Sequence, residues 1–460
     1  MKAIELKSQS GSQLALIGAL VASAIILGRS IAMQSWMIVG AIALIPMLLL
    51  WPVEVALGMF AFSVPFSGFV LSSGSGVSFA WITGALAGMV VLGVGVAFRR
   101  MVVPPAPAVW WSLFAAWGLL SIAWAIDPEK TIHRLPTSLS LVVLFVSTAA
   151  LKASKREFRV AVIATIAGGV VAAALSARTF YTLAGSSDAE HVRGSLALAD
   201  DTETDPNVFA ASLLLPLSLA IGESLSAITL RRRILMWGST AAIAAGILLS
   251  MSRGGFLAVV VLLAVYAYRL RLRWKVLWPI AMVAALLLSM PQFFFSRLAQ
   301  ALPSGGAGRL YIWKAGFEAL KHYPLWGAGL DNFQMAYRPY SGYAPRFYGY
   351  FRAAHNIYLQ TAVELGILGF TLMLASVASH FRQIQRLRKE KGNLIALRLV
   401  PYEAAGCALL AAGFFLDIVW QKLFWLVWIL AVIAVQVTRN TPALVASPAE
   451  DRADYSQISA

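Results

Sequence analysis

Long apolar runs follow one another along nearly the whole of this chain of 460 residues. Hydrophobic residues make up 59% of the chain and charged residues only 13%, whereas soluble globular domains carry roughly 45–50% and 25%. Because a helix needs about 20 mainly apolar residues to cross a bilayer core, the runs predict a multi-span membrane protein. They exclude an ordinary soluble enzyme, a disordered chain, a collagen and a disulfide scaffold.

The apolar segments predict the fold class, an all-α polytopic integral membrane protein. Several of the fourteen segments are shorter than a full span, so we expect about 12, and between 12 and 14, transmembrane helices. Residues 1–460 are predicted to form a single transmembrane domain. The segments are residues 13–28, 33–51, 53–71, 77–97, 106–124, 138–151, 158–177, 208–226, 234–250, 254–268, 276–290, 356–378, 401–417 and 420–437.

Lysine and arginine predict the orientation, since both are enriched in cytoplasmic loops. With a cytoplasmic N-terminus, 23 of the 37 basic residues lie inside and 14 lie outside. Both termini are then cytoplasmic, and the polar tail 441–460 is predicted to be disordered. The net charge of +16 follows from this asymmetry and from attraction to anionic membrane lipid. It requires no nucleic acid as a partner.

One long loop, residues 291–355, carries cations on the side where topology disfavours them. It contains seven basic and two acidic residues, and alternation of the spans places it outside the cytoplasm. Residues 308–322 contain no proline and predict a short amphipathic helix, which Pro324 ends. The many aromatic residues of the loop, Tyr311 among them, are suited to an interfacial belt or to packing on sugar rings. The belt is the commoner role for any one of them.

Two arginines expected outside are the main candidates for an anion site. Arg253 lies in a tight hairpin followed by two glycines, where guanidinium and backbone can approach an anion closely. Arg309 falls in the first turn of the predicted loop helix, where its side chain and the free N–H groups can bind one anion together. The alternative for either residue is an arginine that only anchors at the membrane interface. Arg193 and Arg352 are secondary candidates.

His355 is the candidate for proton transfer, because histidine titrates near neutral pH. It stands three residues after Arg352, so the two would share a helix face if the next span began early enough. Glu364 would lie on the opposite face and deeper, and we expect it to pair with a polar group on another helix. The sequence contains no Walker A, HExxH or GxSxG motif and no Cys/His cluster, and therefore predicts no metal and no cofactor.

The order of these motifs resembles the O-antigen ligase family, a superfamily shared with O-antigen polymerases and O-linked oligosaccharyltransferases. The matching features run through roughly the second half of the chain, around one large outside loop. They are Asp205-Pro206-Asn207 opening a span, Ser252-Arg253-Gly254-Gly255, Gly308-Arg309, residues 324–329, and His355-Asn356 followed by Glu364, Gly366 and Gly369. Asp205 replaces the usual first asparagine of its motif.

The resemblance implies a metal-independent, inverting glycosyltransferase with a GT-C-like helical fold, in the cell inner membrane with its active site on the periplasmic face. The donor would be O-antigen on undecaprenyl diphosphate, and the acceptor a sugar of the lipid A core. His355 would then be the base, and Arg309 and Arg253 would hold the diphosphate. Substrate-binding residues would be Arg193, Arg352, Asn207, Asn356 and Tyr311.

Other functions remain open at this point. An O-antigen polymerase or an O-linked oligosaccharyltransferase would use the same donor. A flippase or transporter of an anionic lipid belongs to a different class, but transporters usually show internal repeats and charges near the middle of several spans. A structural membrane scaffold would need neither His355 nor Arg253.

Overall fold

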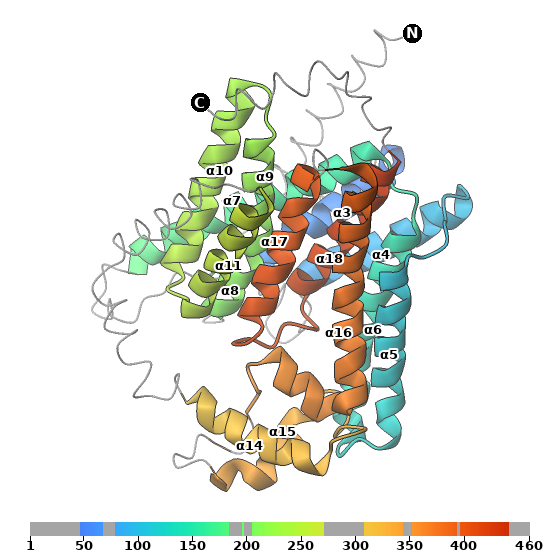
Figure 1. The fold of residues 1–460 in the computed structure, drawn as a ribbon, viewed down its shortest axis with the longest axis vertical. Helices are drawn as coiled ribbons and strands as arrows, with labels where there is room; N and C mark the ends of the chain where they lie inside the picture. The colour runs from blue at the N-terminus through green and yellow to red at the C-terminus, as the bar shows by residue number, and fades with distance from the viewer. Residues whose placement is uncertain are drawn as a thin grey trace, which may run out of the picture.

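The computed structural model describes residues 47–67, 79–183, 196, 205–270, 308–343, 349, 352–392 and 396–440. This part of the chain is a bundle of helices with a small helical subdomain at one end (Figure 1). Its one β contact is an isolated bridge between Met101 and Leu151. The all-α class predicted from the sequence is confirmed.

Eleven of the fourteen predicted segments overlap described helices, and eight described helices are long and apolar enough to cross a membrane. The segments 13–28, 276–290 and most of 33–51 lie outside the described residues, so the total of about 12 stays a prediction. The helices are α3 Pro52–Ser63, α4 Phe79–Ala97, α5 Ala106–Leu120, α6 Pro128–Ala150, α7 Lys155–Leu183, α8 Pro206–Ser212, α9 Leu214–Leu225, α10 Leu230–Leu249, α11 Arg253–Arg269, α14 Arg309–His322, α15 Phe333–Tyr337, α16 Ile357–Lys391, α17 Ala396–Ala412 and α18 Lys422–Arg439.

Small residues let the bundle helices approach closely, as is common between membrane helices. A Cβ atom on Gly168 of α7 would lie 2.4 Å from the carbonyl oxygen of Phe62. One on Gly246 of α10 would lie 2.6 Å from the side chain of Ala173 in α7. Larger side chains at either position would therefore push α7 away from its neighbours.

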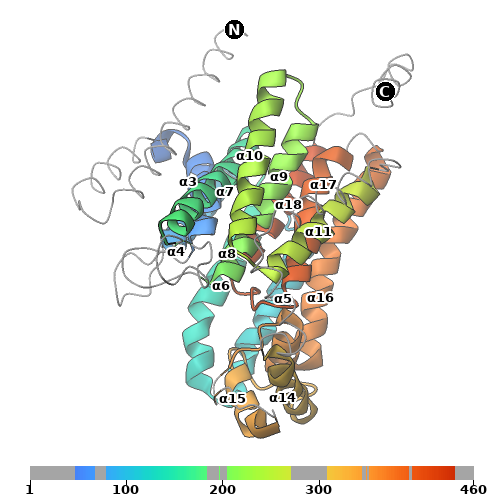
Figure 2. The same cartoon turned by 90° about the vertical axis from the view of Figure 1, so that its left-hand side faces the viewer.

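The two ends of the bundle differ in charge. At the end that we call the basic end, arginines meet buried carboxylates: Arg100 lies 2.7 Å from Glu157, and Arg269 and Arg388 both bind Glu403. At the opposite end, which we call the loop end, α14 and α15 lie against extensions of α5, α6 and α16 (Figures 1 and 2). This separation is what the alternation of the predicted spans requires.

The helical subdomain of the loop end consists of α14, α15 and the 3-10 turn Arg338–Tyr343. The helix predicted for 308–322 is confirmed as α14, and it ends before Pro324 as expected. Residues 291–307, residues 344–348 and 350–351, and the tail 441–460 lie outside the described residues. The boundaries of the predicted large loop and the disorder of the tail therefore stay predictions.

The segment between α14 and α15 docks on a break in α16. At Gly366 the backbone has φ 66° and ψ −173°, a region that essentially only glycine occupies. The break frees carbonyls of α16: Ala328 N donates to Val363 O at 2.9 Å and Gly329 N to Glu364 O at 2.8 Å. Ile367 N donates to Pro324 O at 2.9 Å. The loop and the span are thus joined through backbone.

We predict that Gly366→Ala loosens this attachment. A Cβ atom there would lie 2.0 Å from Leu325 O, and the backbone conformation alone costs a non-glycine residue of order 1–3 kcal/mol. Limited proteolysis between α14 and α15 should be faster in the variant, and thermal unfolding should begin at a lower temperature. Gly342→Ala is the matched control, because its Cβ atom would meet nothing within 4 Å. Equal behaviour of the two variants would contradict the docking role.

Candidate active site

Four helices begin close to one another at the loop end. Their N-cap residues are Asp205 for α8, Ser252 for α11, Gly308 for α14 and Asn356 for α16. The N-terminus of a helix carries a partial positive charge and unpaired N–H groups. An anion placed between these helix starts would meet both the backbone dipoles and the arginines of the same turns.

The starts of α8 and α11 are joined by a short chain of hydrogen bonds. Asn207 donates through its backbone N–H and its Nδ2 to Asp205 Oδ1, at 2.8 and 2.9 Å. Ser252 Oγ donates to Asn207 Oδ1 at 2.9 Å and accepts from Gly255 N at 3.0 Å. Asn207 therefore holds the first turn of α11, where Arg253 begins the helix, beside Asp205.

Arg309 approaches this pair from the loop. Gly308 takes a left-handed conformation, φ 83°, and turns the chain into α14 so that Arg309 is its first residue. The guanidinium lies 5.8 Å from the centre of the Phe415 ring. Within the described part of the chain it has no hydrogen bond or ion pair to a protein group. Phe415 follows α17, and a Cβ atom on Gly254 would lie 3.5 Å from its side chain, so Arg309 and the first turn of α11 border one aromatic residue.

The pKa of Arg309 lies below its ordinary value. Burial contributes most to this shift, the charge of Arg253 adds to it, and Asp205 opposes it. Arginine nevertheless stays protonated, so two like charges are held near each other in a partly buried place. A bound anion would relieve this repulsion.

His355 lies on the stretch between Arg352 and α16, half-buried, with φ 48°. Left-handed backbone is uncommon for a residue with a side chain and concentrates at functional sites. Burial lowers the pKa of His355, the charges of Arg309 and Arg352 lower it further, and Asp205 opposes them. The imidazole is therefore neutral at pH 7, and within the described residues it makes no hydrogen bond to the protein.

The prediction that Arg352 and His355 share a helix face is wrong, because α16 begins only at Ile357. Asn356 accepts from Tyr358 N and Leu359 N at 2.9 and 3.0 Å and so caps that helix. Trp313 Nε1 donates to Ala354 O at 2.9 Å and ties α14 to the stretch that carries His355.

The remaining candidates are less closely placed. Tyr311 is half-buried in the first turn of α14, and Arg352 is exposed. Arg193 lies outside the described residues. No group of His, Cys, Asp and Glu side chains that could hold a metal occurs in the described ranges. Phe415 was not identified from the sequence as part of the site. A phenylalanine near the end of an apolar run gives no signal that an arginine from a distant loop will lie over its ring.

Glu364 is not part of this cluster. Its buried carboxylate accepts from Asp331 N at 3.1 Å and from Phe333 N, at the start of α15, at 3.4 Å. Gln360 Nε2 donates to it at 3.0 Å and to Asp417 Oδ2 at 2.8 Å. Glu364 thus fixes the loop to α16. The sequence predicts that Glu364 pairs with a polar group on another helix. Its partners in the structure are mainly backbone N–H groups of the loop.

Taken together, the arrangement brings arginines and a histidine of lowered pKa to one place. The charges of Arg309 and Arg352 act on His355, Arg253 acts on Arg309, and Asp205 acts on both His355 and Arg309. Such a site can stabilise a leaving group that gains negative charge while the imidazole takes a proton from an attacking hydroxyl.

Comparison with known proteins bears on the same region. Residues 238–374 match the model of the O-Antigen ligase family. Over this segment the match bears out the family resemblance predicted from the sequence. The matched segment runs from α10 into α16 and includes Arg253, Arg309, Arg352 and His355.

The chain is also similar to "Exopolysaccharide production protein ExoQ" of Rhizobium meliloti (strain 1021), with 35% identity over 92 residues. The matched stretch covers 18% of this chain and 20% of that protein. The chain therefore matches only about a fifth of the length of that relative.

We predict that substitutions of Arg352 and Asp205 move the pKa of His355 in opposite directions. Arg352→Gln removes a charge that lowers the pKa, so the pKa should rise toward its ordinary value of about 6.5. Asp205→Asn removes the charge that raises it, so the pKa should fall further, while asparagine still caps α8. NMR titration of labelled histidine, assigned with His355→Gln, measures both shifts. Arg338→Gln, an exposed loop arginine, should change nothing. Shifts of the same sign would contradict the proposed surroundings of His355.

Proposed function

We propose that this protein is an O-antigen ligase. It would transfer O-antigen polysaccharide from undecaprenyl diphosphate to the lipid A core, completing lipopolysaccharide. The observation that carries the proposal is the position of His355 near Arg309, and of Arg309 near Arg253, within the segment that matches the O-antigen ligase family. The donor is already activated by its diphosphate, so no nucleotide sugar and no cofactor is needed.

The proposed location is the cell inner membrane, with both termini cytoplasmic and the active site on the periplasmic face. The pairing of arginines with carboxylates at the basic end supports this orientation, because cytoplasmic ends are rich in Lys and Arg. The helical bundle with a helical subdomain at its loop end is compatible with a GT-C-like fold.

In the proposed reaction, the acceptor hydroxyl attacks the anomeric carbon of the first donor sugar. His355 accepts the hydroxyl proton as the new C–O bond forms. The bond from the anomeric carbon to the diphosphate breaks, its electron pair stays on the diphosphate oxygen, and the configuration inverts. Arg309 and Arg253 stabilise this charge in place of a metal ion, so transfer should proceed in EDTA.

The other proposed substrate residues have separate tasks. Arg352 and Arg193 would contact outer phosphate or acidic groups, and Tyr311 would contact a sugar near the start of α14. Asn207 and Asn356 would act chiefly by holding the starts of α11 and α16, since their amides already bind backbone or side chains there.

An O-antigen polymerase is the second candidate, and the similarity to a protein named for exopolysaccharide production favours it. The two are separated by the chains that accumulate in a strain lacking the gene. A missing ligase should leave polymerised chains on the lipid carrier, whereas a missing polymerase should leave single repeat units ligated to the core. Electrophoresis of lipopolysaccharide and of extracted lipid-linked glycans reads out the difference. Accumulation of unflipped single units would contradict both candidates.

We predict a division of labour between His355 and Arg309. His355→Ala should lower the transfer rate by about 10²-fold or more, the low end of what positioned proton transfer contributes, and should leave donor affinity nearly unchanged. Arg309→Lys and Arg253→Lys keep the charge but lose the forked geometry, so both should weaken binding of undecaprenyl diphosphate and lower transfer. Steady-state transfer and binding by the purified variants measure these effects.

Arg338→Lys is the matched control for the lysine variants, since Arg338 is an exposed arginine of the same loop. It should transfer at the rate of the unmodified protein. Near-normal transfer by His355→Ala would remove this residue as the base. Full activity of the Arg309→Lys and Arg253→Lys variants would reduce these arginines to interfacial anchors.

A further inference from the structure

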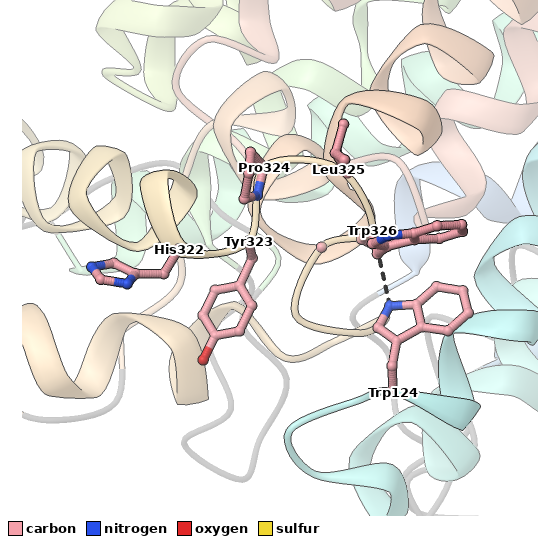
Figure 3. A pocket seen from close by; sticks show the side chains of 7 residues that line it. Trp124, His322, Tyr323, Pro324, Leu325 and Trp326 are labelled. Carbon is pink, nitrogen blue, oxygen red and sulfur yellow. Dashed lines mark hydrogen bonds between the residues drawn. The ribbon is translucent and has the colours of Figure 1, made fainter.

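A second candidate binding place lies at the far end of α14 from Arg309. It is an open pocket of about 570 Å³, lined by Trp124 and by residues 322–327 (Figure 3). We call it the tryptophan pocket. His322 and Tyr323 come from the end of α14 and Trp326 from the docked segment, while Trp124 comes from the connection between α5 and α6.

The walls of the tryptophan pocket are held in place from several directions. Trp124 Nε1 donates to Trp326 O at 3.1 Å, the interaction drawn in Figure 3. Trp117 stacks on Trp326 with ring centres 5.3 Å apart and planes at 26°, and its own Nε1 donates to Leu365 O at 2.9 Å. Ile126 N donates to Ala328 O at 2.9 Å. The indole rings are therefore preorganised, although Trp326 is 54% exposed.

The chemistry of the lining selects a particular kind of ligand. None of the seven lining residues is Lys, Arg, Asp or Glu, so the pocket has no charge partner for a phosphate. The indole rings of Trp124 and Trp326 lie at one side of the pocket, and the polar side chains of His322 and Tyr323 lie at the other (Figure 3). An acyl chain would use the indole faces but neither of the polar side chains. A sugar ring has apolar C–H faces for the indoles and hydroxyl edges for the polar groups, and it matches both features.

The position of the pocket fits a long substrate. α14 has 14 residues, which at 1.5 Å per residue separates its two ends by about 20 Å. That distance is spanned by several linked sugars. A polysaccharide whose reacting end lies near Arg309 and His355 could thus reach the tryptophan pocket with sugars farther along the chain.

We propose that the tryptophan pocket binds sugar residues of a substrate glycan several units away from the bond that is formed. The inference rests on the proposed glycosyl transfer and adds a second glycan contact to it. The bound glycan is either the donor polysaccharide or the acceptor oligosaccharide, since both present the same ring chemistry. Trp326 supplies the main ring face.

Trp326→Ala tests the proposal, because it removes the indole but keeps the backbone oxygen that Trp124 binds. Transfer by the full-length purified protein is measured with a long-chain donor, a single-repeat donor, a complete core acceptor and a truncated core acceptor. We expect KM to rise about 3- to 10-fold, the range of one aromatic contact, for the long form of one substrate only. The affected substrate, donor or acceptor, identifies the glycan that is bound. The rate kcat with the short forms should be unchanged, and Trp326→Phe should restore KM to within about 2-fold.

Phe317→Ala is the matched control. Phe317 is an aromatic residue of α14 with 55% exposure, close to the 54% of Trp326, but it does not line the pocket. If the exposed aromatic residues only anchor the loop at the membrane interface, Trp326→Ala and Phe317→Ala should change KM for the long substrate equally. That result overturns the proposal. An effect of Trp326→Ala that is equal for long and short substrates overturns it as well.

Binding of the free oligosaccharide, released from the donor and lacking lipid and diphosphate, is followed separately by NMR line broadening. Binding that is lost in Trp326→Ala and kept in Phe317→Ala supports the pocket even if the protein transfers no glycan, so failure of the proposed function is distinguishable. If Trp326→Ala binds both this oligosaccharide and the free core oligosaccharide as well as the unmodified protein does, the pocket is overturned even if transfer occurs.

Discussion

The backbone contact between the loop segment 324–331 and the break in α16 positions the rest of the candidate site. A continuous helix would satisfy its own carbonyls and offer the loop nothing but side chains. Because Gly366 interrupts α16, Val363 O and Glu364 O accept from Ala328 and Gly329 instead. Glu364 adds its carboxylate to the same attachment through two N–H groups of the loop. These hydrogen bonds from backbone groups and from Glu364 fix the position of the subdomain relative to α16.

This seating determines what lies at each end of α14. At one end, Arg309 comes beside Phe415, Arg253 and Asp205, and Trp313 secures the stretch that bears His355. At the other end, Trp326 completes a pocket with Trp124. The helix α14 thus has a positively charged site at its start and an uncharged aromatic pocket at its end. This arrangement suits the proposed substrate, a glycan that carries its diphosphate at one terminus only.

Local patterns predicted the local features of this arrangement. The absence of proline from 308–322 and the presence of Pro324 predicted α14, and the hairpin glycines together with the outside cations singled out Arg253 and Arg309. The break at Gly366 was not predictable, since it depends on a backbone contact with a segment about 40 residues earlier in the chain. For the same reason the left-handed backbone of His355 was not predictable. Its surroundings come from α8, α14 and the end of α17, which no spacing within one segment reveals.

The contrast between the two ends of the bundle argues most directly for an anionic ligand. At the basic end Arg100 pairs with the buried Glu157, and Arg269 and Arg388 share the buried Glu403, so each of these arginines has a carboxylate partner. Arg309 differs from these arginines, because it has no ion pair within the described residues and because burial and then the nearby charge of Arg253 lower its pKa. Holding like charges together in a partly buried place costs free energy of folding. A bound anion would lower this cost, so the start of α14 is a suitable place for a negatively charged group of a substrate.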